Sequence, residues 1–141
     1  MKVATVFKYT SAQSAYKDSR IDLSLGFANN QAGSGRSITA IPCLAIVADD
    51  HGNGYVALIK SVTDPAEAIW NKVDPTAPQW KYVYDAIPVT PVMPIPTPEL
   101  YPNVHPQWMK TEDRLELAKK MLTIRKINGD ELENAFAIEL K

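Results

Sequence analysis

The amino-acid sequence predicts an α+β fold: a small, mostly antiparallel β-sheet body with one short helix, then a Pro-rich extended arm and a C-terminal helical segment. Three observations lead to this prediction. Apolar and polar residues alternate in the first half of the chain, which is typical of strands with one face against a core. Seven of the 11 prolines fall between Pro88 and Pro106, where they exclude a helix. From Met109 onward, charged residues alternate with apolar ones at helical spacing.

The length and the charge of the chain limit the classes of protein to which it can belong. Its 141 residues fit one domain, in which we distinguish a body (1–85), an arm (86–108) and a C-terminal segment (109–141). The chain has 15 basic and 16 acidic residues, which argues against a protein that binds nucleic acid through bulk positive charge. The single cysteine, Cys43, excludes an intramolecular disulfide and a Cys-rich zinc module.

The first quarter of the chain predicts two strands with a loop between them. Val3–Tyr9 alternates but has apolar residues on both sides, which indicates a strand that is at least half buried. Thr10–Ser19 consists largely of small and polar residues and predicts a loop. Ile21–Phe27 alternates strictly, which predicts a strand in a sheet with one face in water. Asn29–Ser37 is rich in Gly, Asn and Ser and predicts a flexible connection.

Two apolar runs on either side of a turn predict a β-hairpin. The runs are Ile38–Ala48 and Tyr55–Val62, and the turn between them is Asp49–Gly54. Its Asp, Asn and Gly residues favour a tight reversal of the chain. Pro42 lies inside the first run, which favours an edge position or a bulge there, because proline cannot donate a ladder hydrogen bond.

A short helix is predicted over Pro65–Val73. Asp64 is its expected N-cap, and proline is favoured at the first helical position because its missing N–H costs nothing there. We expect this helix to bury Ile69 and Trp70. The segment Trp80–Asp85 then alternates aromatic residues with others, which predicts a further strand with an aromatic face.

The Pro-rich segment 86–108 has one formally charged side chain, that of Glu99. Each proline removes a backbone donor and restricts the residue before it, so an extended polyproline-like conformation is favoured and a central strand is not. Because disordered segments are usually charged and poor in apolar residues, we expect this arm to be covered by its own body or by a neighbouring subunit. The residues expected to make that contact are Pro91, Met93, Ile95, Pro96, Leu100, Tyr101 and Trp108.

Charged residues return in the C-terminal segment and predict two helices. Thr111 is the expected cap of the first, which has two carboxylates in its first turn, where they interact favourably with the helix dipole. Asn128 and Gly129 predict either a helix stop or a hairpin turn. Asp130–Leu140 has apolar residues at a spacing of four and favours a second short helix.

The sequence motifs have structural explanations. Gly33–Ser37 lacks the pattern of a phosphate-binding loop and precedes a predicted strand, whereas phosphate loops precede a helix. Asp49–Gly54 begins like a calcium loop, but Lys60 stands where that motif needs a glutamate. His51 and His105 do not form a metal-ligand pair by spacing. We therefore expect no cofactor and no metal.

Two functions remain open from the sequence. The first is a non-enzymatic structural or assembly subunit that docks its Pro-rich arm on a neighbouring subunit or partner, for example in a virion as a phage head or tail component. A proline-rich arm loses little entropy on ordering, so it can lie along a partner at low cost. The alternative is an enzyme or a small-ligand-binding protein with a site at the Gly33–Ser37 or the Asp49–Gly54 loop. Its polar groups would be Arg36, Asp49, Asp50 and His51.

A third interpretation is a regulator whose arm is recognised as a polyproline ligand. Pro88, Pro91 and Pro94 have the P-x-x-P spacing, but the flanking Arg or Lys of such ligands is missing. In all cases we expect protein partners, a homo-oligomer or a larger assembly, and no nucleic acid. No apolar run approaches the roughly 18–20 residues of a membrane span, and Lys8 interrupts the short N-terminal run. We therefore expect no membrane association, no conventional signal peptide, and a cytoplasmic or virion location.

Overall fold

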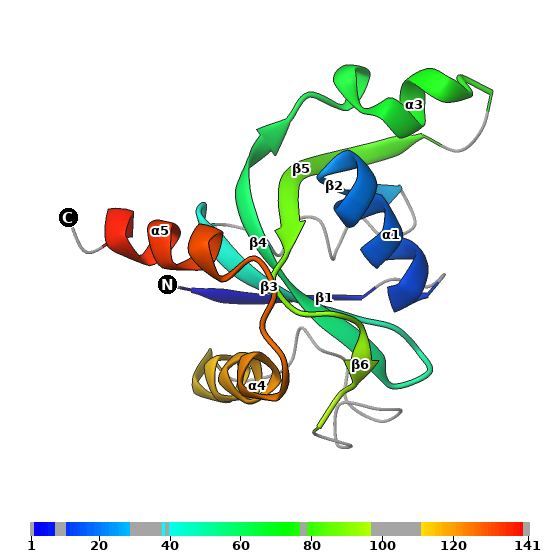
Figure 1. Ribbon diagram of the computed structural model, residues 1–141. Helices are drawn as coiled ribbons and strands as arrows, with labels where there is room; N and C mark the ends of the chain where they lie inside the picture. The colour runs from blue at the N-terminus through cyan, green and yellow to red at the C-terminus, as the bar shows by residue number, and fades with distance from the viewer. Residues whose placement is uncertain are drawn as a thin grey trace.

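One sheet, to which all six strands of the described residues belong, forms the centre of the protein (Figure 1). The computed structural model describes residues 2–7, 11–28, 38, 40–76, 79–96 and 111–139. The strands are β1 (Val3–Phe7), β2 (Ser24–Ala28), β3 (Cys43–Ala48), β4 (Asn53–Thr63), β5 (Trp80–Pro88) and β6 (Met93–Pro94). The helices are α1 (Ala12–Asp22), α3 (Ile69–Val73), α4 (Thr111–Ile124) and α5 (Gly129–Glu139), with the 3₁₀ turn η2 (Pro65–Glu67) before α3.

The strand order is β1-β3-β4-β5-β2, and the short β6 pairs with β4. The pair β1–β3 is parallel, and the other described pairs are antiparallel. The protein therefore has the predicted α+β fold with a mostly antiparallel sheet. Helices cover both faces of this sheet, α1 on one and α4 and α5 on the other (Figure 1).

Alternation along the strands divides the buried side chains between two cores. Leu44 of β3 is paired with Leu58 of β4, and both lie in the first core, which contains residues of α4 and α5. Their neighbours Ala45 and Ala57 are also paired, and both lie in the second core, which contains residues of α1. Because β3 and the part of β4 from Gly54 to Ile59 are buried on both faces, their sequences are nearly continuous apolar runs.

The predicted hairpin is confirmed as β3 and β4. Their register runs from Cys43 opposite Ile59 to Ala48 opposite Gly54. Gly52 in the turn has a φ of 81°, a left-handed conformation that glycine adopts without a side-chain clash. The strand β3 begins later than the predicted run Ile38–Ala48, because Pro42 has no N–H to donate to the ladder.

The segment Thr10–Ser19 is predicted to be a loop, but Thr10 lies outside the described residues and Ala12–Ser19 belongs to helix α1. Ser11 is its N-cap, and its Oγ accepts a hydrogen bond from the Ser14 N–H at 3.0 Å. The face of α1 toward the sheet has small side chains such as Ala12 and Ala15, which are buried in the second core. Such residues let the helix approach the sheet closely, but they contribute little to an apolar pattern in the sequence.

Helix α1 also shortens the strand predicted over Ile21–Phe27. The helix continues through Ile21 to Asp22, and its C-cap is Leu23, which has a φ of 53°. The strand β2 therefore begins at Ser24. The body consequently contains more helix than the single short one that the sequence predicts.

The helix predicted over Pro65–Val73 is divided into η2 and α3. Asp64 is the N-cap of η2 as predicted, and its Oδ1 accepts a hydrogen bond from the Ala66 N–H at 3.0 Å. The prediction that Ile69 and Trp70 are buried is wrong, since both side chains are exposed. The reason is position: η2 and α3 lie at the outer end of β4 and β5, beyond the faces covered by α1, α4 and α5 (Figure 1).

The first residues of the segment predicted as an arm belong to the sheet. Strand β5 lies between β4 and β2 and continues to Pro88, so Ala86–Pro88 belongs to the sheet and not to an arm. The register with β2 ends at Asp85, opposite Ser24, so Ala86–Pro88 is in register with β4 alone. Beyond β5, the Val56 N–H donates to Thr90 Oγ1 at 2.9 Å, and the Val89 N–H donates to the Val56 carbonyl at 2.8 Å. As a domain boundary, residue 86 stays a prediction.

Both predicted C-terminal helices are present as α4 and α5. Asn128, with a φ of 49°, stands between them, so the helix-stop interpretation is the right one of the two. The connection is attached to the end of β5, because the Asn128 Nδ2 donates to the Pro88 carbonyl at 2.7 Å and the Ile127 N–H donates to the Val89 carbonyl at 2.7 Å. None of the described helices is long and apolar enough to cross a membrane.

Candidate functional site

The carboxylate of Asp49 holds the β3–β4 turn against the start of α1. Asp49 is buried, and its Oδ2 accepts a hydrogen bond from the Ala12 N–H at 2.8 Å. Its Oδ1 accepts from the His51 N–H at 2.9 Å and from the Asn53 N–H at 3.0 Å. Both oxygens are therefore bonded to main-chain donors, which gives Asp49 a structural role. A role in ligand binding stays a prediction.

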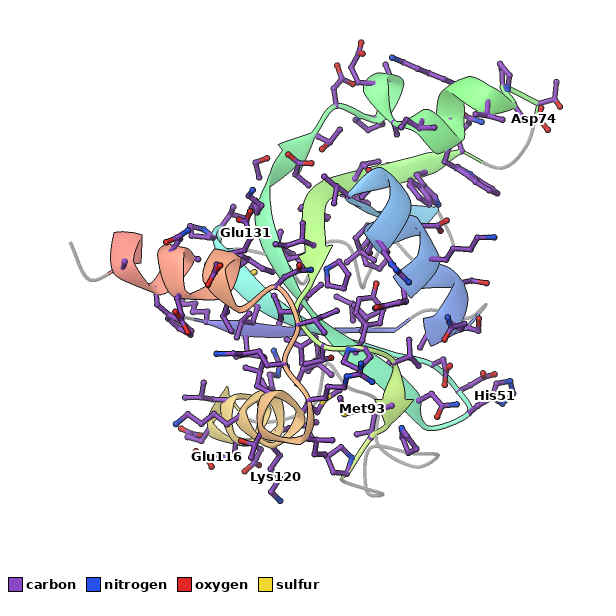
Figure 2. The ribbon with its side chains drawn as sticks, in the orientation of Figure 1. His51, Asp74, Met93, Glu116, Lys120 and Glu131 are labelled. Atoms are coloured by element: carbon purple, nitrogen blue, oxygen red, sulfur yellow. The ribbon has the colours of Figure 1, made fainter. Side chains whose placement is uncertain are left out.

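The other polar residues of this turn face the solvent. Asp50 and His51 are exposed, and the His51 Nε2 lies 3.6 Å from the Asp50 Oδ1. Figure 2 shows His51 at the tip of the hairpin, pointing away from the sheet. Arg36 and the Gly33–Ser37 loop lie outside the described residues, so their predicted role in a ligand site stays a prediction.

The described part of the Pro-rich segment packs on its own body. Met93 and Ile95 are buried in the first core, and Met93 is paired with Gly54 of β4. The Ile95 N–H donates a hydrogen bond to the Gly52 carbonyl at 2.8 Å. Pro91 is half-buried. The remaining predicted contact residues Leu100, Tyr101 and Trp108 lie outside the described residues.

Pro96, the last described residue of this segment, lines a shallow groove on α4. The groove has a volume of about 480 Å³ and includes the side chains of Glu116 and Lys120, which Figure 2 shows on the outer side of α4. The undescribed residues 97–110 connect Pro96 to Thr111, the first residue of α4. Both ends of that connection therefore lie at α4.

Four large apolar side chains are exposed at the outer end of β4 and on α3. They are Val62, Ile69, Trp70 and Val73, with exposed fractions of 68%, 50%, 45% and 77%. We call this surface the apolar projection. All four are absent from the cores of the described residues.

Helix α3, which carries three residues of the apolar projection, is attached to strand β5 by specific contacts. The rings of Trp70 and Trp80 are stacked, with centroids 5.7 Å apart. Asn71 is buried between α3 and β5, where its Oδ1 accepts from the Trp80 N–H at 2.8 Å and its Nδ2 donates to the Trp80 carbonyl at 3.1 Å. These contacts with Trp80 attach α3, and with it the exposed side chains, to strand β5.

A second surface feature is a groove of about 750 Å³ that we call the basic groove. It carries the side chains of Arg20 from α1, Lys60 from β4 and Arg125 from the connection between α4 and α5. Glu131 of α5 also lines it, and its Oε2 lies 3.6 Å from the Lys60 Nζ. The other lining residues are Tyr16, Leu23, Ile87, Pro88, Pro91, Ile127 and Asn128.

Sequence reasoning did not identify the basic groove. Arg20, Lys60 and Arg125 lie in three separate segments, and only the fold brings them together. One signal is present at Lys60, which ends the continuous apolar run of β4 and begins the exposed part of the strand. The predicted contact residue Pro91 also lines this groove.

The buried titratable groups are suited to packing rather than to reaction. Burial raises the pKa of the Cys43 thiol to about 11, so the thiol is neutral and a weak nucleophile near pH 7. Burial also raises the pKa of Tyr55, whose hydroxyl lies 2.9 Å from the Ser19 Oγ in a buried hydrogen bond. Among the residues that the structure describes, no three His, Cys, Asp or Glu side chains form a group that could hold a metal ion.

Comparison with known proteins returns no match to a family model, a curated protein or a solved structure. The apolar projection and the basic groove are therefore interpreted from their own geometry and chemistry.

Proposed function

We propose that the protein is a non-enzymatic assembly subunit that binds a second copy of itself through the apolar projection. The supporting observation is the exposure of four large apolar side chains, one near the end of β4 and three on the α3 helix that follows it, all outside the buried cores. Proteins that act alone rarely expose contiguous apolar surface of this kind, because covering it releases hydration water and is favourable. Covering by another chain is the physical expectation for such a surface.

The Pro-rich segment of a second copy is chemically suited to cover the apolar projection. Between Thr97 and Lys110 the sequence contains Leu100, Tyr101 and Trp108 together with three prolines, and few charged side chains. An apolar segment of this kind matches an apolar surface. Its prolines reduce the conformational entropy that is lost when it is ordered on a partner.

The position of this segment in the fold favours a neighbouring copy over the segment's own body. It starts after Pro96 and returns at α4, whereas α3 lies at the opposite end of the molecule (Figure 1). A contact between the segment of one copy and the projection of the next joins two different surfaces. Such a heterologous contact builds rings or filaments. A multi-copy assembly such as a phage head or tail, in a virion or in the cytoplasm, is the setting we propose for it.

Light scattering after size-exclusion chromatography, over a range of concentrations, tests the proposal. We expect the wild-type protein to self-associate and the Val73→Asp and Ile69→Asp variants to elute as monomers with unchanged circular dichroism. Leu23→Asp is the matched control, because Leu23 is as exposed as Ile69 but lies outside the projection and has a left-handed backbone that aspartate tolerates. Its association should equal that of the wild type.

Replacing residues 97–108 with a Gly/Ser linker of equal length tests whether the Pro-rich segment is what binds the apolar projection. We expect this variant to remain folded and to lose self-association. A wild-type protein that stays monomeric at millimolar concentration would contradict the proposal. Dissociation by Leu23→Asp to the same extent as by Val73→Asp would also contradict it.

A further inference from the structure

The basic groove concentrates positive charge at one place on a protein whose net charge is close to zero. Three cationic side chains line it, those of Arg20, Lys60 and Arg125, and one carboxylate, that of Glu131. Glu131 lies within ion-pair distance of Lys60. Within the described part of the chain, neither Arg20 nor Arg125 has a carboxylate within 4.0 Å. Two guanidinium groups are therefore available to a negatively charged ligand.

The groove also has the size and the walls of a small-molecule site. Its volume of about 750 Å³ lies within the roughly 300–1,000 Å³ that is typical of ligand pockets. Tyr16, Ile87 and Pro88 supply apolar wall beside the charges. The ring of Tyr16 packs edge-on against the buried Tyr55 at a centroid distance of 5.4 Å, so this wall is fixed before any ligand arrives.

The backbone around the groove is held by specific contacts. Leu23 and Asn128 are the two residues other than glycine with positive φ among those described, and both line the groove. Such conformations are uncommon and persist where surrounding contacts maintain them. Here the Asn128 side chain donates to the Pro88 carbonyl, which joins the α4–α5 connection to the end of β5. The walls contributed by the end of β5 and by the α4–α5 connection are thus set relative to one another.

From these observations we propose that the basic groove binds a small organic phosphate of about mononucleotide size. The planar guanidinium groups of Arg20 and Arg125 match the oxygens of a phosphate, to which arginine forms paired hydrogen bonds. The apolar body of the ligand lies against Tyr16 and Ile87. Glu131 opposes binding, because it repels the phosphate and holds Lys60 in an ion pair.

Isothermal titration calorimetry at low ionic strength, with pyrophosphate and with adenosine 5′-monophosphate as probes, tests this site. We expect saturable binding of both to the wild-type protein, weakened by added salt because the side chains are exposed. Arg20→Glu and Arg125→Glu should each reduce affinity about tenfold or more, in line with the loss of a charge-assisted hydrogen bond and the addition of a repulsion. Glu131→Gln should increase affinity by about threefold.

Two controls separate the site from general electrostatics. Lys17→Glu makes the same change of sign on the same helix as Arg20→Glu, but Lys17 does not line the groove, so its affinity should stay within about twofold of the wild type. Citrate carries comparable charge without phosphate and should bind more weakly than pyrophosphate. The Val73→Asp variant should bind as the wild type does, because the groove and the apolar projection share no residue.

Three results would overturn the proposal. The first is no saturable binding of either probe. The second is an equal loss of affinity in Lys17→Glu and Arg20→Glu, which would indicate diffuse attraction to the whole surface. The third is binding of citrate as tight as that of pyrophosphate, which would assign the groove to carboxylates.

Discussion

Gly26 lies where β2 meets the aromatic side chains of β5, and its missing side chain makes room for one of them. A Cβ at this position would overlap the indole ring of Trp80, near the ring atoms closest to the backbone. That part of a tryptophan side chain has little freedom to move aside. The close approach of β2 and β5 therefore depends on glycine at this residue.

We predict that Gly26→Ala lowers the free energy of unfolding by about 1–3 kcal/mol, the usual cost of overpacking a buried contact. Urea unfolding followed by circular dichroism measures the change. Gly129→Ala is the control, because an added Cβ there meets only the flexible end of Lys126, and alanine favours a helix more than glycine does. It should be neutral or stabilising. An unchanged midpoint for Gly26→Ala would show that Trp80 has space to shift.

The buried thiol of Cys43 predicts a loss of stability at alkaline pH. Burial raises the pKa of Cys43 from its ordinary 9.0 to about 11 in the folded protein. Between these two values the unfolded chain has released the proton and the folded chain still holds it, so unfolding becomes more favourable as pH rises. We therefore expect a stability contribution that is complete below pH 9.0 and is lost as pH approaches about 11.

Urea unfolding from pH 7 to pH 11 measures this effect. In Cys43→Ala the decline attributable to the thiol should disappear, which leaves a shallower dependence on pH than in the wild type. Equal slopes in the two proteins would contradict the prediction. Under native conditions at pH 7.5, the thiol should react with a disulfide reagent far more slowly than it does in urea.

At the scale of elements, one carboxylate joins the β3–β4 turn to α1. Asp49→Ala removes the acceptor of three main-chain hydrogen bonds, two within the turn and one at the first residue of α1. We predict a decrease of about 2–3 kcal/mol in the free energy of unfolding, because bonds to a charged acceptor are stronger than neutral ones and the donors are left unpaired.

Hydrogen exchange distinguishes a local loss of the contact between the β3–β4 turn and α1 from a general loss of stability. The amides of α1 should exchange faster in Asp49→Ala than in the wild type, with a larger change than the amides of α4. Asp50→Ala is the control, since its carboxylate is exposed and lies 3.6 Å from the exposed His51, and among the described residues it accepts no main-chain hydrogen bond. This substitution should alter stability by less than about 0.5 kcal/mol. Equal effects of the two substitutions would contradict the assignment.

Elements with a local chemical cause could be predicted from the sequence. The hairpin follows from the turn residues Asp49–Gly54 between two apolar runs, and the cap at Asp64 follows from its position before Pro65. Helix α5 follows from the spacing of its apolar residues. In each case the interaction that defines the element lies within a few residues of it.

Elements that depend on distant contacts could not be predicted in this way. Helix α1 buries alanine and serine rather than large apolar residues, so its periodicity is weak in the sequence. Its first N–H is bonded to Asp49, which is distant in the chain. Ala86–Pro88 joins the sheet through its register with the distant residues Ala57–Ile59 of β4, which no local pattern indicates. Ile69 and Trp70 are exposed because of where α3 lies, which no local pattern encodes.

At the scale of the molecule, two cores share one sheet, and we predict that they unfold together. Leu25 lies in the second core and Met121 in the first, and both are buried. Leu25→Ala and Met121→Ala should each lower the free energy of unfolding by about 2–5 kcal/mol. Because the two side chains lie on opposite faces of the sheet, the double variant should show the sum within about 0.5 kcal/mol.

Urea unfolding of all four proteins, followed by tryptophan fluorescence and by far-ultraviolet circular dichroism, tests this expectation. The two signals should give one coincident transition in each protein. Separate transitions would show that the layer containing α4 and α5 unfolds independently of the layer containing α1.

Each candidate site is formed by residues from separate elements, which is why the sequence alone did not predict it. The three cations of the basic groove come from α1, β4 and the connection after α4, and the apolar projection joins the end of β4 with α3. The sequence did indicate that the Pro-rich segment is apolar enough to need covering, and Met93 and Ile95 are indeed covered by their own body. Which surface covers Leu100, Tyr101 and Trp108 stays a prediction.

The parallel pairing of β1 with β3 has a consequence for how the chain is made. Val3 is paired with Leu44, so about 40 residues separate the two strands in the sequence. As the polypeptide leaves the ribosome, β1 emerges well before its partner and has to stay available until β3 follows, whereas β3 and β4 meet across a short turn as soon as both are out. An apolar strand waiting in this way is a target for chaperones, and slower translation between β1 and β3 would lengthen the wait.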